Sequence, residues 1–453
     1  MSSLSRRSFI AATAALAATP AFAAIPASGE VDVVVVGAGA AGIAAARRIA
    51  AARRSFALIE ASDRSGGRCV TDTRTFGVPY DRGAHWIHLP KLNPLAALAD
   101  KAGVEIYPAP RGQRLRVGPR DAREGEMEDF LAALVRSSRA IVEAARGKTD
   151  VAANRVLPTD LGEWRPTVEF VLGPYSAAKD LADVSAIDFA RAPERDVDAF
   201  CRQGYGALLA KLAEGLPVAL STPATRIEWL KGLEVETTKG RFRARAVIVT
   251  VSTSVLAAGR IAFSPELPKR QLDAIAQLKL GSYDHVALEL PSNPLGLQRD
   301  ELVFEKCEGT RTAALLANVS GTDLCLVDVG GPFGRDLAAQ GSAAMITFAG
   351  DWLASLYGSS VKRAIKRTHA TRWSQEPWVL GAFAAATPGG DYARKVMTEP
   401  LRERVLFAGD AVHESLWGTV GGAWQSGERA AEAALRKIGA LTDPDAPKTR
   451  RRR

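Results

Sequence analysis

Three glycines near the start of the chain have a spacing suited to holding a phosphate. Gly37, Gly39 and Gly42 form a G-x-G-x-x-G pattern that follows the apolar run 31–36 and leads into an alanine-rich stretch. Glycines at this spacing let the backbone approach a pyrophosphate, and the helix that follows offers free N–H groups and a partial positive charge. The chemistry predicted for this turn, which includes Ala41, is the binding of a dinucleotide.

A carboxylate follows at the position where a ribose would lie. The apolar run Phe56–Ile59 ends at Glu60. A carboxylate at the end of a second strand accepts hydrogen bonds from ribose hydroxyls and repels a 2′-phosphate. The order of strand, glycines, helix, strand and terminal acid therefore predicts a site that prefers FAD or NAD over NADP.

The rest of the chain must supply the elements that position these groups. Residues 31–60 are predicted to form strand, helix and strand, and 218–251 a β-meander whose strands are 224–229, 233–238 and 242–251. Apolar spacing and turn residues predict further elements: helices over 124–146, 196–216 with a break at 204–206, 361–369 and 421–438, and a strand over 283–290.

Length and composition limit the function classes. With 453 residues the chain is too long for one hydrophobic core, so two domains are expected, and 47% apolar with 24% charged residues is ordinary for a globular protein. Much of the net charge of +9 lies near the two ends, and no basic stripe with interleaved aromatics is present, which disfavours nucleic-acid binding.

Four cysteines are too widely spaced for a C-x-x-C motif; they are Cys69, Cys201, Cys307 and Cys325. No zinc site or redox pair is therefore suggested, and no metal is expected. Spacing does not assign disulfides, and buried free thiols are favoured.

The first residues resemble a targeting segment. Arg6 and Arg7 lie in a twin-arginine pattern, an alanine-rich apolar stretch follows, and 21–23 is a small-x-small cleavage site. This order predicts a twin-arginine signal peptide over 1–23, partnership with the export machinery, and a mature chain that works in the periplasm or outside the cell. No other apolar run approaches the length of a membrane span, and 441–453 is predicted to be a disordered basic tail.

Several ordered motifs resemble the flavin-dependent amine oxidases, the group that includes monoamine oxidases, polyamine oxidases and histone lysine demethylases. They are the acidic strand end with its glycines at 60–68, the segment 81–88 followed by Asn93-Pro94, the strand 246–251 ending at Leu256, the segment 373–377 with Gly381, and the C-terminal stretches 407–410, 418–423 and 426–431. The similarity covers most of 31–438 and is weakest in 100–200.

The resemblance implies a fold class and a domain division. The class is α/β: a two-domain flavin amine oxidase-like fold with a Rossmann-type FAD-binding domain and a discontinuous α+β substrate domain. The FAD-binding domain is expected to comprise 30–90, 204–280 and 395–440, and the substrate domain 91–203 and 281–394.

The cofactor implied is FAD, bound without a covalent bond. Ala382 aligns with the cysteine that tethers the flavin in covalent monoamine oxidases, and alanine cannot form that bond. Asp410 stands where relatives usually carry glutamate, and Ala224 takes the position whose backbone meets the adenine. The resemblance adds further cofactor-binding positions to those of the first turn: Arg64, Gly67, Arg68, Ala224, Gly409, Asp410, Thr419 and Val420.

Four residues are implied at the reacting end of the site. His88 matches a histidine at the polyamine-oxidase cleft, where it can hydrogen-bond an amine. Trp373 and Phe383 align with aromatic residues beside the flavin. His285 aligns with a lysine that holds a water against flavin N5; for His285, that role and a hydrogen-bonded core histidine are equally favoured.

The activity implied is the FAD-dependent oxidation of a small-molecule amine. The carbon next to nitrogen transfers a hydride to flavin N5, the imine is hydrolysed, and O2 reoxidises the flavin to give hydrogen peroxide. Three alternatives remain open. They are a periplasmic amine dehydrogenase with another electron acceptor, suggested by His285, a non-catalytic flavin-binding scaffold, and an L-amino-acid oxidase, for which no carboxylate-binding cation is evident.

Overall fold

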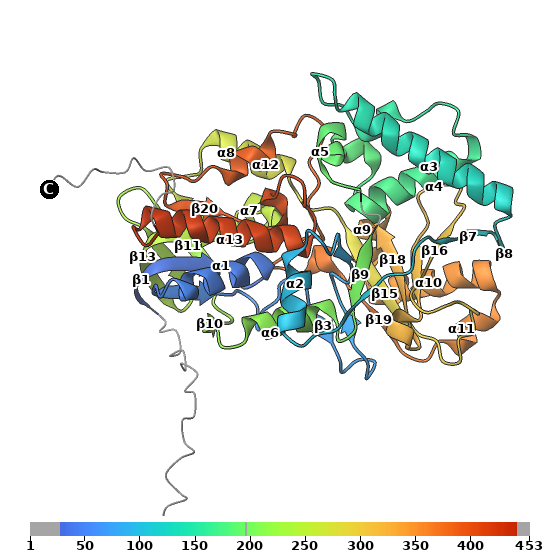
Figure 1. Cartoon of the computed structure of the whole chain (residues 1–453), viewed down its shortest axis with the longest axis horizontal. Coiled ribbons are helices and arrows are strands. Elements are labelled where there is room, and N and C mark those ends of the chain that lie inside the picture. The colour runs from blue at the N-terminus through green and yellow to red at the C-terminus, as the bar shows by residue number, and fades with distance from the viewer. Residues whose placement is uncertain (1–27, 195–196, 442–453) are drawn as a thin grey trace, which may run out of the picture.

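The computed structural model describes residues 28–194 and 197–441. The predicted signal peptide and all but the first residue of the predicted tail lie outside the described residues. Two large sheets dominate the molecule, one around β1 and β13 and the other around β15 and β18 (Figure 1). Within the described part, no helix combines the length and apolar character needed to cross a membrane.

The first sheet has eight strands. Their order is β10 (Val218–Ala219), β2 (Phe56–Ile59), β1 (Gly29–Val36), β13 (Gly240–Val249), β12 (Glu234–Thr237), β11 (Ala224–Glu228) and β14 (Ala262–Ser264), and β20 (Val405–Phe407) also pairs with β13. β1 is parallel to both β2 and β13, whereas β12 is antiparallel to its two neighbours. The predicted strand–helix–strand unit and β-meander are confirmed.

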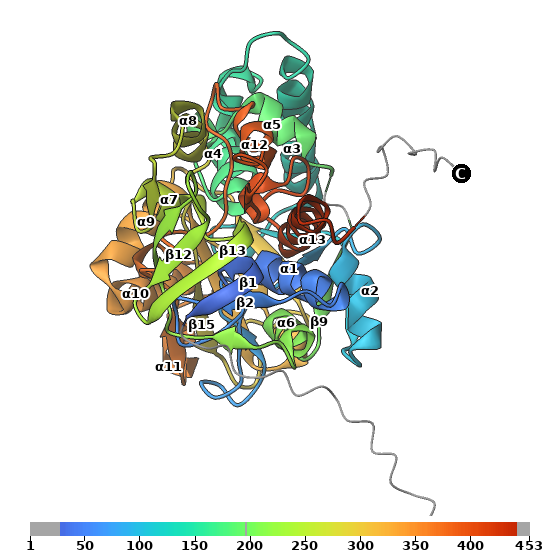
Figure 2. The ribbon, with the colours of Figure 1, turned by 90° about the vertical axis from the view of Figure 1, so that its left-hand side faces the viewer.

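Two helices pack together on one face of this sheet (Figure 2). They are α1 (Ala40–Ala51) and α13 (Val420–Lys437), from opposite ends of the sequence. Small residues allow the close approach: a Cβ added at Gly427 would lie 2.1 Å from the backbone oxygen of Ala41. One face of β1 supplies Val33 and Val35 to the same core.

The other face of the first sheet is covered by three short helices, α7 (Thr253–Ala257), α8 (Lys269–Gln277) and α12 (Ala393–Thr398). Two further helices, α2 (Pro94–Lys101) and α6 (Tyr205–Ala213), pack against Ile43 and Ala44 of α1. The four cysteines are buried and free, which is the alternative that the sequence analysis favoured.

The second sheet has seven strands. Their order is β19 (Thr368–Ala370), β15 (Tyr283–Glu289), β18 (Leu324–Gly330), β17 (Ala314–Ala317), β16 (Glu301–Glu305), β7 (Arg114–Val117) and β8 (Arg120–Asp121). All neighbours are antiparallel except β16 and β7. Every residue of β18 is buried, because helices and loops cover both sides of this strand.

Two groups of helices cover the second sheet. One contains α9 (Gly331–Gln340), α10 (Ser342–Tyr357) and α11 (Ser360–Ala364). The other contains the long helix α3 (Glu124–Ala144) with α4 (Arg165–Phe170) and α5 (Ala186–Arg191). The helix predicted over 124–146 is confirmed. Single helical turns complete the chain: 3-10 turns at Ala153–Val156, Gly162–Trp164, Leu181–Asp183, Val319–Gly321, Trp373–Gln375 and Asp410–Val412, and a π turn at Val171–Tyr175.

Two of the predicted helices are partly wrong. The stretch predicted as helical over 196–216 begins, after the undescribed Asp196, with strand β9 (Asp198–Cys201), which lies between β5 (Ile87–His88) and β6 (Ile106–Pro108). Pairing with these distant strands outweighs the local apolar spacing. Likewise, the helix predicted over 361–369 ends at Ala364, and β19 follows on the edge of the second sheet. The remaining strands, β3 (Thr71–Asp72) and β4 (Tyr80–Asp81), pair with each other.

Candidate active site

One cavity is lined by residues of both large sheets. All the residues predicted as catalytic or cofactor-binding line it except Gly42. Gly42 instead lies within the turn between β1 and α1, where an added Cβ would be 1.8 Å from the backbone oxygen of Gly37. Only glycine fits at this point, so Gly42 shapes the turn rather than the cavity surface.

The N-terminus of α1 opens onto the cavity. Gly39 is its N-cap residue and supplies no side-chain hydrogen bond to the helix. Gly66 N donates to Ala38 O at 2.8 Å, and a Cβ added at Gly67 would lie 3.3 Å from Gly39 Cα. An uncapped helix end with a second glycine segment pressed against it leaves backbone exposed to a ligand, as a pyrophosphate requires.

Glu60 is buried just after β2, and its carboxylate accepts three hydrogen bonds, two of them from Ser62. Its Oε2 accepts from Ala38 N at 2.7 Å, and its Oε1 accepts from Ser62 N at 2.9 Å. These donors fix the carboxylate at the cavity edge, beside the turn that precedes α1. Ala224, at the start of β11, lines the same end of the cavity. This arrangement fits the adenosine half of a dinucleotide.

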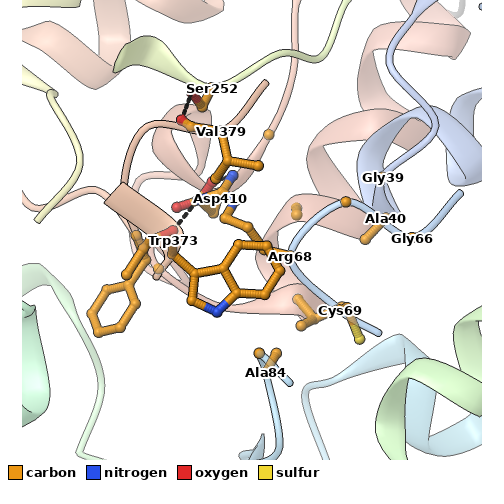
Figure 3. Close-up of a pocket in the computed structure, with 18 of the residues that line it drawn as sticks. Gly39, Ala40, Gly66, Arg68, Cys69, Ala84, Ser252, Trp373, Val379 and Asp410 are labelled. Atoms are coloured by element: carbon orange, nitrogen blue, oxygen red, sulfur yellow. Dashed lines mark hydrogen bonds and ion pairs between the residues drawn. The ribbon is translucent and has the colours of Figure 1, made fainter. Parts of the chain in front are cut away.

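Arg68 and Asp410 join the two ends of the sequence inside the cavity wall. Arg68 Nη2 lies 2.6 Å from Asp410 Oδ1, and Arg68 Nη1 donates to Ala382 O at 2.5 Å. Figure 3 shows Arg68 and Asp410 among the residues that line the cavity, together with Trp373. Arg68 is therefore a partly buried side chain that joins two segments through two different acceptors, and not a surface ion pair.

Two further predicted cofactor residues have defined contacts. Arg64 Nη1 donates to Gly67 O at 2.8 Å, and burial lowers the pKa of Arg64. Thr419 caps α13: its Oγ1 accepts from Gly422 N at 2.9 Å and donates to Leu416 O at 2.7 Å. The cap leaves the first turn of α13 at the cavity, with Val420 as its first residue.

Trp373 and Phe383 form part of the aromatic wall. Trp373 is buried, its backbone N donates to Asp284 Oδ1 at 2.8 Å, and its Nε1 donates to Arg82 O at 2.9 Å. The ring of Phe383 lies 5.9 Å from that of Tyr283, and a Cβ added at Gly418 would be 3.0 Å from it. Both rings are thus held between β15 on one side and the segments around Arg82 and Gly418 on the other.

His285 has protein partners at both ring nitrogens. Its Nδ1 lies 2.5 Å from Asp328 Oδ1, and its Nε2 lies 2.8 Å from Gly83 O. The ring is buried but lines the cavity. These contacts favour the hydrogen-bonded core histidine over a water-holding group, because both nitrogens are already engaged.

His88 is paired with a carboxylate that sequence reasoning missed. Its Nδ1 lies 2.9 Å from Asp198 Oδ1, and its ring is parallel to that of Trp86 at 6.4 Å. Asp198 belongs to β9, the strand predicted as helix, so the wrong secondary structure concealed it. The pair places an imidazole and a carboxyl group at the cavity surface.

Apolar side chains from the second sheet and its helices form the remaining wall. Tyr175 contacts Phe304 edge-on at 5.0 Å and Tyr283 at 6.0 Å. Sequence reasoning assigned none of this wall, half of which lies in the region 100–200 where the motif similarity is weakest: Leu134, Val171, Tyr175, Tyr283, Leu302 and Phe304. Together they enclose space suited to a hydrocarbon or aromatic group.

A Rossmann-type sheet, a second sheet and a shared cavity define a two-domain flavoprotein fold. Residues 40–435 match the family model described as flavin-containing amine oxidoreductase. The chain therefore belongs to the flavin-containing amine oxidoreductases, and the predicted fold class is confirmed.

Known relatives and structures agree with this assignment. Lysine-specific histone demethylase 1B of Mus musculus is 27% identical over 88% of this chain, and polyamine oxidase 2 of Arabidopsis thaliana is 25% identical over 90% of this chain and 88% of its own length. The chain spans only about half (52%) of that demethylase. Two solved structures share the fold: putrescine oxidase bound to putrescine (TM-score 0.77, 22% identity, 90% of this chain and 100% of that one) and cyclohexylamine oxidase from Brevibacterium oxydans IH-35A (0.76, 22%, 91% and 100%).

Proposed function

We propose that this protein binds FAD non-covalently and oxidises an amine. The observation that carries the proposal is the continuity of one cavity from the uncapped N-terminus of α1 to the aromatic wall of the second sheet. When bound, FAD supplies the capacity to accept a hydride. The proposed holding residues are the predicted cofactor set around α1, Glu60, Arg68, Asp410 and the first turn of α13.

The chain's own residues would bind and orient the amine. The aromatic wall excludes water, which favours a neutral amine over an ammonium ion. His88 and Asp198 offer a hydrogen-bonding pair at the same surface. Ala382 lines the cavity and has no group that could bond to the flavin, which supports non-covalent binding.

Purified protein tests cofactor and activity together. We expect the purified protein to have a flavin absorbance spectrum and to release all of its FAD into the supernatant on acid precipitation. Under anaerobic conditions an amine should bleach the flavin, at a rate that rises with pH. Protein-bound FAD that survives precipitation would contradict non-covalent binding. Bound FAD that no amine reduces would favour a scaffold, and protein that takes up no FAD would overturn the proposal.

The charges of the cavity predict which amines react. Four carboxylates line it in the described part of the chain: Glu60, Asp410, Glu376 and Asp198. Glu60 and Asp410 form hydrogen bonds to cofactor-binding segments, and Glu376 lies near Arg64. Asp198 is therefore the one carboxylate of these four that lies beside the apolar wall. A polyamine needs several carboxylates along its length, whereas an apolar monoamine needs one or none. We expect cyclic or aryl-alkyl monoamines to bleach the flavin at least tenfold faster than spermidine; the reverse order would contradict this substrate class.

An amine dehydrogenase is the second candidate. It is favoured by His285, whose two ring nitrogens are bonded to Asp328 and Gly83 and so hold no water toward the cavity. Stopped-flow mixing of the reduced enzyme with O2 separates the candidates. Fast reoxidation with stoichiometric hydrogen peroxide supports the oxidase, and slow reoxidation that a one-electron acceptor accelerates supports the dehydrogenase.

We also propose export through the twin-arginine pathway to the periplasm or beyond. Support comes from the order of Arg6-Arg7, the apolar stretch and the small-x-small site at 21–23. Mass spectrometry of protein expressed in a bacterium with this pathway should find an N-terminus near Ala24. An Arg6→Lys, Arg7→Lys double variant should remain in the cytoplasm uncleaved, and its normal export would contradict the proposal.

A further inference from the structure

Asp328 is a buried carboxylate that contacts two cavity-lining side chains without lining the cavity itself. It lies on β18, where its neighbours along the strand are apolar. Its Oδ1 is 2.5 Å from His285 Nδ1, and its Oδ2 accepts from the Tyr283 hydroxyl at 2.8 Å. The side chains of His285 and Asp328 are 7% and 2% exposed, so water competes little for these contacts.

The partners of His285 determine how many protons its ring carries. An ionised carboxylate and a backbone carbonyl are acceptors only, and they face Nδ1 and Nε2 respectively. A neutral imidazole has one N–H and one bare nitrogen, so it can satisfy only one of these acceptors. An imidazolium satisfies both.

We propose that Asp328 is a positioning residue that keeps His285 as an imidazolium at neutral pH in the cavity wall and closes both ring nitrogens to water and to substrate. The positive end of the pair lies at the cavity, and the negative end lies behind it. The ring is therefore unavailable as a proton acceptor. Where FAD is bound as proposed above, this charge stabilises the negative charge that builds on the flavin as it is reduced.

The electrostatic surroundings agree with this geometry. Burial alone would lower the pKa of His285, but the Asp328 carboxylate and the Gly83 carbonyl raise it to about 9. The other charged or titratable groups on the packed segments are Asp284, Tyr283 and Glu289 on β15, His369 on β19 with Arg372 just after it, and Tyr80, Asp81, Arg82 and His85 near Gly83. Asp284 adds a weaker attraction for the proton of His285.

The proton count of His285 can be measured directly in the FAD-loaded full chain. The protein contains five histidines, so 15N-histidine labelling gives few signals, and His285→Gln identifies the one of interest. We expect two protonated ring nitrogens at pH 7 and a titration midpoint near 9 in the wild type. A bare ring nitrogen at pH 7 would overturn the proposal, whether or not any amine proves to be a substrate.

Asp328→Asn assigns the effect to the carboxylate. The asparagine Nδ2 can donate to a bare Nδ1, and its Oδ1 can still accept from Tyr283, so the neutral ring keeps its contacts and the fold is expected to survive. The midpoint should fall below the ordinary 6.5, a loss of more than about two pH units, or about a hundredfold in proton affinity. An imidazolium that persists at pH 7 in this variant would refute the role of Asp328.

Tyr283→Phe is the matched control. It removes the other hydrogen bond to Asp328 and leaves the charge pair in place. We expect His285 in this variant to titrate close to the wild-type midpoint. A fall as large as that in Asp328→Asn would mean that loss of any contact in the cluster changes the ring, which contradicts a specific role for the carboxylate.

The His285–Asp328 pair stabilises the folded protein by an amount that depends on pH. Because the pKa of His285 is higher in the folded state than the ordinary value of 6.5, the contribution is fully present below pH 6.5 and is lost as the pH rises through about 9. Urea unfolding at pH 6, 8 and 10 should show the wild type losing its advantage over Asp328→Asn in this interval. An advantage that is constant or grows with pH would contradict the assignment.

Discussion

Replacing Arg394 by methionine should lower the free energy of unfolding by about 3–5 kcal/mol, because it leaves a fully buried carboxylate without its cation. Arg394 and Asp188 are both 0% exposed, with Nε to Oδ1 at 2.6 Å and Nη2 to Oδ2 at 2.7 Å. Arg394 also donates to the carbonyls of Ala384 and Ala411. Urea unfolding at neutral pH measures the loss.

A surface pair provides the control for this substitution. Arg270 and Glu399 form an ion pair with side chains 58% and 40% exposed, and its removal should change stability by less than about 1 kcal/mol. Arg270→Met should therefore unfold at nearly the wild-type urea concentration. If Arg394→Met and Arg270→Met lower the free energy of unfolding equally, burial does not determine how much each ion pair contributes to stability.

The second large effect is expected at the contact between α1 and α13. Gly427→Ala would place a Cβ 2.1 Å from a backbone oxygen of Ala41, and no side-chain movement can relieve that overlap. The helices must separate, and both of their N-termini line the cavity. We expect a stability loss of about 1–3 kcal/mol and FAD affinity reduced about 10- to 100-fold. Fluorescence titration of apoprotein with FAD measures the affinity.

Gly125→Ala tests whether the loss is due to overlap or simply to the loss of a glycine. Gly125 lies in the first turn of α3, where an added Cβ meets no atom within 4 Å. Alanine there should be neutral or stabilising by about 0.5–1 kcal/mol, because helical glycine is unfavourable. FAD affinity that falls equally in both variants would contradict the packing explanation.

The first turn of the cofactor site could be predicted from local sequence because its parts are contiguous. Strand, glycines, helix and Glu60 lie within 31–60, and each has a preference that agrees with its place in the fold. The residues carried over from motif resemblance all line the cavity, and Gly42 of the first turn is the one predicted site residue that does not. What they do there remains a prediction.

The substrate side could not be predicted, since it depends on contacts between distant segments. Asp198 lies in a strand whose partners are β5 and β6, and nothing in 196–216 specifies that pairing. Asp328 could have been identified from the sequence, because it is the single carboxylate in the apolar run of β18. A buried charge in such a run requires a partner. The identity of that partner, His285, follows only from the register between β15 and β18.

The paired N-termini of α1 and α13 have a consequence for how the protein is made. β1 is synthesised before β20 and α13, which complete this side of the cavity only when residues 405–437 have been made. A nascent chain that stops before this point has Glu60 and the glycine turn but lacks Asp410 and Thr419. Coenzyme capture must therefore wait until these residues have been synthesised, and a product that terminates before them has no complete pocket to fill.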